Sequence, residues 1–299
     1  MRVYCIEHKT TYRYGELVTV CHNEAHLQPR ETPTQRCLRH ELVINPLACT
    51  MVRRQDYFGN PTHYFEVEDA HQELEVESSS TVEVSPYVVR LDRLSPPWDD
   101  LARQIHQSTD PGIIEARSFS IASPLVGLVK EIDEYARISF TPGRPVLEAV
   151  SHLCRRIFEE FSFDPKATTV STPIVDVLRQ RSGVCQDFAH LAIGCLRQVG
   201  LPARYVSGYI ETDPPDGEQR LVGADASHAW AATFVPDFGW IDFDPTNNLL
   251  PADRHIVLAW GRDYGDVTPL KGVVIGGGAH QLDVAVDVIP RPLEGCAYP

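Results

Sequence analysis

The chain contains 299 residues, of which 43% are hydrophobic and 23% charged, values typical of a soluble globular protein with one large domain or two ordinary ones. Its net charge of −14 argues against general binding to nucleic acid or to an anionic membrane surface. No apolar run is long enough to span a membrane, and the first residues lack the apolar stretch of a signal peptide, so we expect a cytoplasmic protein without a membrane partner.

Residues 1–85 predict strands and no helix. Six segments are rich in β-branched and aromatic residues, and several of them alternate apolar with polar side chains. We expect these strands to form an amino-terminal β-sandwich domain. The segments are Arg2–Tyr14, Leu17–Leu27, Leu38–Ile44, Met51–Tyr57, His63–Glu68 and Leu74–Val84.

Residues 86–142 predict a connector, and residues 143–299 a second domain. The connector is expected to contain short helices from Trp98 towards His106 and from Pro124 to Tyr135. The second domain opens with helices and continues with strands, an order that predicts an α+β fold.

Three helices are expected in the second domain. The first runs from Pro145 to Phe161 with apolar residues at helical spacing, and the second follows Thr172-Pro173. The third begins at or beside Cys185 and stops at Gly200-Leu-Pro202.

The strands that follow include a predicted hairpin. Ala203–Ile210 is expected to be a strand, and a polar loop from Glu211 to Asp225 follows it. Ser227–Val235 and Trp240–Asp244 are expected to pair as a hairpin, and further strands are expected at 272–275 and 281–289.

Eight cysteines are scattered without a C-x-x-C spacing, which predicts thiols rather than disulfides or zinc ligands. Cys154 and Cys195 fall on the buried sides of their helices, so we expect packed thiols there. Cys185 differs because unpaired N–H groups at a helix start favour a thiolate and can stabilise an oxyanion. An inert cysteine at a helix start is the alternative. The eight are Cys5, Cys21, Cys37, Cys49, Cys154, Cys185, Cys195 and Cys296.

His228 is the candidate base for a Cys185 nucleophile. It opens a strand after a polar loop, and Trp230 lies two residues on, on the same face. A neutral imidazole can take the thiol proton and return it to a leaving amine, although a lone histidine is more often structural. His190, within the Cys185 helix, is interpreted as a residue that packs in the core or supports the residues of the site.

Two acids, Asp242 and Asp244, can orient the base, and they share one face of their strand. A symmetric four-residue hairpin loop would turn both acids away from His228. A three-residue loop with a glycine bulge at Gly239 brings them to the same face, so the hypothesis predicts that irregularity.

Four motifs in the second half of the chain are distinctive when taken together. They are Gly183-Val-Cys-Gln-Asp-Phe-Ala-His190, Gly200-Leu-Pro-Ala-Arg-Tyr-Val-Ser-Gly-Tyr209, Ser227-His-Ala-Trp230 and Trp240-x-x-x-Asp244-Pro-Thr246. Together they resemble the bacterial transglutaminase-like family, whose members are often described as cysteine proteases. The resemblance covers nearly the full length and implies a papain-like α+β core. It also implies Cys185 as nucleophile, His228 as base and Asp244, which precedes a proline, as the orienting acid.

Four further residues are expected to line the pocket: Gln186, Trp230, Tyr209 and Asp242.

The sequence departs from the family pattern in one segment. Animal transglutaminases place a tryptophan upstream of the nucleophile as an oxyanion donor, but segment 161–165 here has none, so the second donor is unassigned. We expect no metal and no cofactor, since the loop at 213–216 lacks calcium-ligand spacing.

These features predict a cysteine-dependent acyl-transfer enzyme that hydrolyses a peptide or isopeptide-type amide through a thioester. Its partner would be a peptide or protein amide substrate, and the oligomeric state is not predicted. An amine-transferring, crosslinking transglutaminase is the first alternative, because it would use the same three residues. A non-catalytic binding module is the second.

Overall fold

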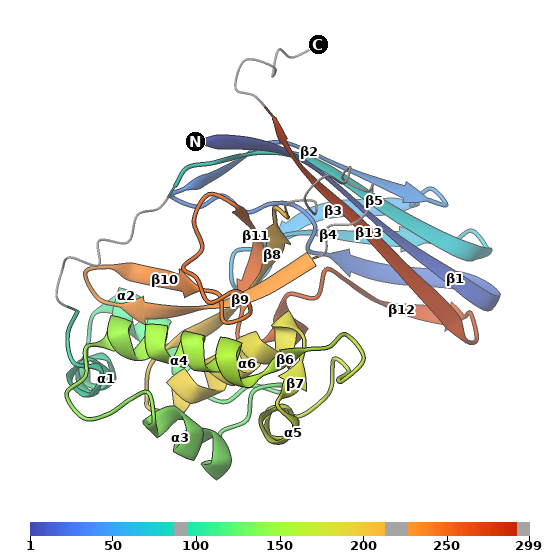
Figure 1. Ribbon diagram of the computed structural model, residues 1–299. Coiled ribbons are helices and arrows are strands. Elements are labelled where there is room, and N and C mark those ends of the chain that lie inside the picture. The colour runs from blue at the N-terminus through green and yellow to red at the C-terminus, as the bar shows by residue number, and fades with distance from the viewer. Residues whose placement is uncertain (87–94, 213–226, 292–299) are drawn as a thin grey trace, which may run out of the picture.

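The computed structural model describes residues 1–86, 95–212 and 227–291. These residues form a seven-stranded sheet and a four-stranded sheet, with the helices gathered on one side of the smaller sheet (Figure 1). No helix in them is both long and apolar enough to cross a membrane. Most of the loop predicted at 211–225 lies outside the described residues.

The larger sheet is built around one long strand, β1, which pairs with β5 along its first half and with β4 along its second half. The strand order is β2-β5-β1-β4-β3. Apolar side chains from both halves, such as Val18, Phe65 and Leu74, pack into one buried cluster. The bounds are β1 Arg2–Ala25, β2 Gln35–Asn45, β3 Thr50–Gln55, β4 Pro61–Val67 and β5 His71–Val84.

The carboxy-terminal strands belong to this larger sheet and not to the smaller one. β12 (Leu270–Gly276) and β13 (His280–Arg291) both pair antiparallel with β1. Residues 1–85 therefore share one seven-stranded sheet with the carboxy-terminal strands. The physical reason is that β1 would otherwise expose a long unpaired edge.

The connector contains short helices that pack beside the smaller sheet. α1 is Trp98–Gln107, α2 is Pro111–Arg117 and α3 is Lys130–Arg137, with a 3-10 turn, η1, at Ser118–Ser120. The first was predicted closely. The third begins six residues later than predicted, because residues 124–129 contain turns and extended backbone.

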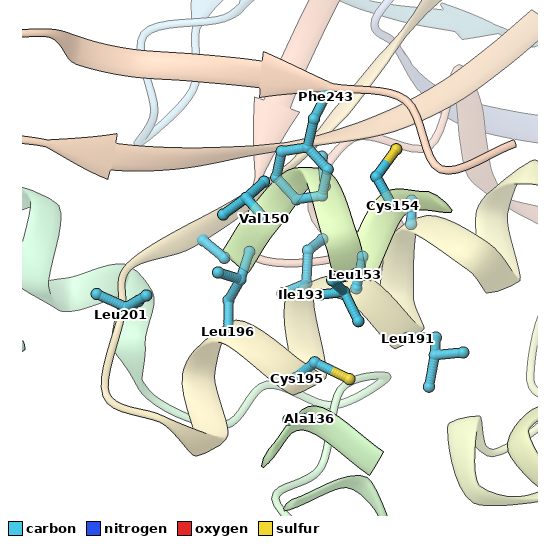
Figure 2. Close-up of a cluster of buried hydrophobic side chains, with 14 of the residues drawn as sticks. Ala136, Val150, Leu153, Cys154, Leu191, Ile193, Cys195, Leu196, Leu201 and Phe243 are labelled. Carbon is cyan, nitrogen blue, oxygen red and sulfur yellow. The ribbon is translucent and has the colours of Figure 1, made fainter. Parts of the chain in front are cut away.

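Three helices, α4 (Val146–Glu160), α5 (Ile174–Gln180) and α6 (Cys185–Gln198), carry the main core. Side chains from α4 and α6 meet Phe243 of the sheet in one cluster (Figure 2). Cys154 and Cys195 lie within this cluster and are buried, so their prediction as packed thiols is confirmed.

The smaller sheet is antiparallel, with strand order β10-β9-β8-β11. Helices α4 and α6 pack on one of its faces, which confirms the α+β class. A buried cluster that includes Tyr4, Tyr209 and Val286 joins it to the larger sheet. The bounds are β8 Ala203–Ile210, β9 Ser227–Val235, β10 Gly239–Phe243 and β11 His255–Gly261, and a short turn, η2, follows at Tyr264–Asp266.

Candidate active site

Cys185 is the first residue of α6, as the sequence predicts. The chain enters the helix in extended conformation at Val184, and the Asp187 carboxylate accepts the Val184 N–H at 2.8 Å and the Thr168 hydroxyl at 2.6 Å. Gly183 is required there, because a Cβ would lie 2.7 Å from an Asp187 carboxylate oxygen. Burial raises the pKa of Asp187, and its hydrogen bonds counter that effect.

The helix start leaves backbone donors free beside the thiol. Phe188 is the first residue whose N–H closes a turn, onto the carbonyl of Val184 at 3.1 Å. The N–H groups before it have no partner within the helix, as at every helix start. They are available to an oxyanion that forms on a substrate carbonyl held at Cys185.

The hairpin that carries the base and the acid has the predicted register. Val235 pairs with Gly239 across a three-residue loop, and Gly239 has a positive φ of 75°. Asp242 pairs with Ala232, which places Asp242 on the same face as His228.

His228 lies between an acid and the thiol. Its Nε2 donates to the Asp244 Oδ2 at 2.8 Å, so Nδ1 is the nitrogen left for Cys185. Burial lowers the pKa of His228, but the hydrogen bond to Asp244 and the neighbouring Cys185 thiol outweigh burial and raise the pKa to about 9. The Asp244 carboxylate therefore stabilises the protonated form of the ring beside the thiol.

Asp244 is fully buried and held by several donors. Its Oδ1 accepts the N–H groups of Thr246 and Asn247 at 2.9 and 3.2 Å. Its Oδ2 accepts the Asn247 side chain at 2.7 Å and His255 Nε2 at 3.2 Å in addition to His228. Burial raises the pKa of Asp244, but the hydrogen bonds to the two histidines hold it well below its usual range.

His255 and Asn247 were not singled out from the sequence. His255 opens a strand directly after a polar segment, as His228 does, and this signal could have identified it. Asn247 follows Asp244-Pro-Thr and offers no comparable pattern, because its role depends on how the turn folds back onto the carboxylate.

The four residues predicted to line the pocket do not lie together in the structure. Gln186 lies beside Cys185 and donates to the Val170 carbonyl at 3.2 Å. Trp230 stacks on the ring of His228 with centroids 6.0 Å apart, while Asp242 faces Arg204. These two residues line a cavity on the sheet face opposite α4 and α6.

Tyr209 lies away from Cys185. Its hydroxyl hydrogen-bonds to His8 of β1 at 2.8 Å, and its ring packs where the two sheets meet. It supports the site by joining the sheets and does not line a pocket at the thiol.

His190 has a packing role, as expected from the sequence. Its Nε2 accepts the backbone N–H of Tyr264 at 3.1 Å, which fastens the turn after β11 to α6. Burial lowers its pKa to about 4, so the ring stays neutral.

One buried group has the composition of a metal site. His228, Asp244 and His255 place nitrogen and oxygen atoms within 4.8 Å of one another. These same atoms hydrogen-bond to each other, which accounts for the grouping without an ion. The acids at 213–216 lie outside the described residues.

The segment that lacks the expected tryptophan lies next to the nucleophile. β6 (Ser162–Phe163) pairs in parallel with β7 (Ser182–Gly183), two residues before Cys185. Phe163 is 58% exposed, so an aromatic side chain lies at the surface here, but it cannot donate a hydrogen bond.

Known proteins show similarity to both parts of the chain. Residues 4–83 match the bacterial transglutaminase-like N-terminal region, and residues 134–245 match the transglutaminase-like superfamily. An uncharacterized protein of Mycobacterium tuberculosis is 41% identical over 295 residues, covering 96% of this chain and 92% of the relative. A protein-glutamine gamma-glutamyltransferase of Pseudomonas aeruginosa is 34% identical over 107 residues, covering 33% of this chain and 16% of that enzyme.

A solved structure has the same fold. A protein of Cytophaga hutchinsonii described as a proposed cysteine protease matches with a TM-score of 0.76 and 21% identity, covering 100% of this chain and 93% of that chain. The chain belongs to the transglutaminase-like superfamily and carries the amino-terminal region of its bacterial members.

Proposed function

We propose that the protein is a cysteine-dependent acyl-transfer enzyme in which Cys185 is the nucleophile, His228 the acid and base, and Asp244 the group that orients His228. The observation that carries this proposal is the buried His228–Asp244 pair beside a thiol at a helix start. Each of the three residues is fixed by a separate element, α6, β9 and the turn after β10, which agrees with a preorganised site.

The first half of the reaction forms a thioester. The Cys185 sulfur attacks the carbonyl carbon of a carboxamide, and the negative charge on the oxygen is stabilised by free N–H groups at the start of α6. The C–N bond then breaks as His228 gives its proton to the leaving amine or ammonia. Asp244 keeps the imidazole oriented throughout.

The second half resolves the thioester. Neutral His228 takes a proton from water, the oxygen attacks the thioester carbon, and the thiolate leaves as the carboxylic acid is released. Hydrolysis of a peptide or isopeptide-type amide is the favoured outcome, because water needs no second binding site.

Amine transfer is the second candidate. The relative from Pseudomonas aeruginosa that matches a third of this chain is named a protein-glutamine gamma-glutamyltransferase. In that reaction an amine replaces water as the attacking group, and the first half-reaction is unchanged.

One incubation separates the two outcomes. A glutamine-containing peptide is mixed with the protein and a labelled primary amine, and the products are read by mass spectrometry. Hydrolysis changes glutamine to glutamate, whereas incorporation of the label would establish amine transfer. A Cys185→Ala variant should give neither product.

Activation of the thiol is tested separately with iodoacetamide at pH 6. Cys185 should alkylate faster than Cys49 even though Cys49 is the more exposed of the two, so a faster reaction of Cys185 reflects activation and not access. Equal rates, together with no change in any glutamine peptide, would favour the non-catalytic binding module.

A further inference from the structure

Three of the four tryptophans in the chain line a cavity of about 750 Å³ away from the thiol. The three are Trp230, Trp240 and Trp260. The cavity lies on the face of the smaller sheet opposite α4 and α6, and its sides come from the larger sheet and from α2. A cavity of this size, whose walls combine aromatic and other apolar side chains with polar and charged groups, has the character of a small-molecule site.

Arg204 of β8 is held at the cavity wall by two aromatic rings. Its guanidinium carbon lies 4.4 Å from the centroid of Trp240 and 3.7 Å from that of Trp260. Stacking covers the flat surface of the guanidinium and leaves its edge, where the N–H donors are, for in-plane hydrogen bonds.

These donors have no partner among the residues that the structure describes. Arg204 is 7% exposed, and within the described ranges its side chain makes neither a hydrogen bond nor an ion pair. Asp242 acts on it through charge without an ion pair between them. Burial lowers the pKa of Arg204 to about 9, as expected for a buried cation without a bonded counter-ion.

Other polar atoms of the wall are also unpaired. Arg30 Nε and His255 Nδ1 are buried and lack a hydrogen-bond partner in the described part of the chain, while Trp230 Nε1 faces the Asp242 carboxylate. All three side chains line the cavity with Arg204. Buried unpaired polar atoms are uncommon in proteins, and those of Arg204, Arg30 and His255 around one space indicate an absent bonding partner.

The unpaired edge of Arg204 favours an anion. Arg30 and Arg204 both stack on Trp260, and the wall also contains two acids, Asp242, which faces Arg204, and Glu115 of α2. The anion is therefore expected at the edge of Arg204, where the donors lack a partner. The planar edge of a guanidinium matches a carboxylate in a bidentate geometry. The aromatic walls around it favour an apolar or aromatic body over a column of water, which needs several polar partners for each molecule.

We propose that this cavity is a second ligand site, which takes a small organic carboxylate with an aromatic or apolar body, bound through Arg204 and the tryptophan walls. The site is separate from the thiol and does not rest on the proposed acyl-transfer activity. Binding is therefore expected in Cys185→Ala as well as in the natural chain.

Binding is tested on the full chain with 4-phenylbutyrate, its neutral amide and 4-phenylbutylamine. Tryptophan fluorescence follows each titration, because three of the four tryptophans lie in the cavity wall, and calorimetry gives the affinity. The carboxylate should bind about tenfold or more tightly than the amide, as a hydrogen bond to a charged group does. The amine should bind weakest.

Two substitutions with opposite expected effects on carboxylate affinity test where the ligand binds. Arg204→Met should weaken carboxylate binding at least about tenfold. Asp242→Asn should tighten it, because it removes the negative charge nearest the guanidinium, and a loss of folding cannot mimic that gain. Arg54→Met is the matched control, since Arg54 stacks on Tyr64 outside this cavity, and it should leave the affinity unchanged.

Three outcomes would overturn the proposal. They are no binding of the carboxylate, equal binding of acid and amide, and binding that neither Arg204→Met nor Asp242→Asn alters. If Arg204→Met fails to fold, the Asp242→Asn variant decides. Carboxylate binding that is not tighter in this variant would count against the site.

Discussion

His228 is the residue in which the chemistry of the site is concentrated, because its pKa depends on both of its neighbours. Burial by itself would leave the ring neutral, and the Asp244 carboxylate and the Cys185 thiol reverse that effect. Two measurable consequences follow. One concerns which acid raises the pKa of His228, and the other concerns how the stability of the fold depends on pH.

The first consequence distinguishes the two candidate acids. Asp244→Asn should return the pKa of His228 from about 9 towards 6.5, because the amide cannot stabilise the imidazolium as a carboxylate does. Asp242→Asn should change this pKa far less, since Asp242 faces Arg204. Histidine NMR titration of both variants measures the difference, and a larger shift in Asp242→Asn would reverse the assignment.

The second consequence is a dependence of stability on pH. A folded pKa of about 9 against 6.5 in the unfolded chain gives about 3 kcal/mol of stability. This stability is fully present below pH 6.5 and is lost as the pH rises through 9. His228→Gln should therefore cost more stability at pH 6 than at pH 10.

Urea unfolding of both proteins at the two pH values measures this difference. A cost that grows with pH would show that the ring is neutral in the folded protein.

The three residues proposed for catalysis could be picked out from the sequence because their local settings are distinctive. A cysteine at a helix start, a histidine opening a strand and an acid before a proline each leave a pattern in the chain. The contacts of Asn247 and Tyr209 were not predictable. Asn247 reaches Asp244 only because the turn folds back onto the carboxylate, and the bond between Tyr209 and His8 joins segments 201 residues apart.

At the scale of elements, the hairpin of β9 and β10 decides whether the acid can reach the base. Its three-residue loop sets a register in which Asp242 and the acid beyond it share the face of His228. The sequence left both the symmetric and the three-residue loop open, and the catalytic hypothesis required the three-residue loop. Glycine permits this loop because it adopts the positive φ at position 239 without strain.

Gly239→Ala tests the backbone requirement at this loop. The φ of 75° strains any residue with a Cβ, so we expect a loss of about 1 to 2 kcal/mol of folding free energy. Gly127→Ala is the control: neither glycine has an atom within 4 Å of the added Cβ, and Gly127 lacks a positive φ. Chemical denaturation of the two variants measures this, and equal losses would mean that φ is not the cause.

At the scale of the whole molecule, β13 ties the larger sheet to the smaller one. Val286 and Val288 of β13 lie in the buried cluster that contains Tyr209 and Ile256. Sequence alternation predicted a strand at 281–289 but not its partner, because pairing between the two ends of a chain leaves no local signal.

Val286→Ala should lower the stability of the full chain by about 1 to 2 kcal/mol, since it leaves a gap between the sheets. Val284→Ala in the same strand should cost less than about 0.5 kcal/mol, because Val284 is 50% exposed. Thermal unfolding compares them, and equal effects would show that the β13 contact does not join the sheets energetically.

The pairing of β1 with β13 also bears on synthesis. Val3 lies opposite Arg291, so the first strand leaves the ribosome 288 residues before its last neighbour is made. At ordinary elongation rates this delay is roughly 15 to 60 s. Throughout that time the nascent strand has an open hydrogen-bonding side, which makes it a natural client for chaperones that act during translation.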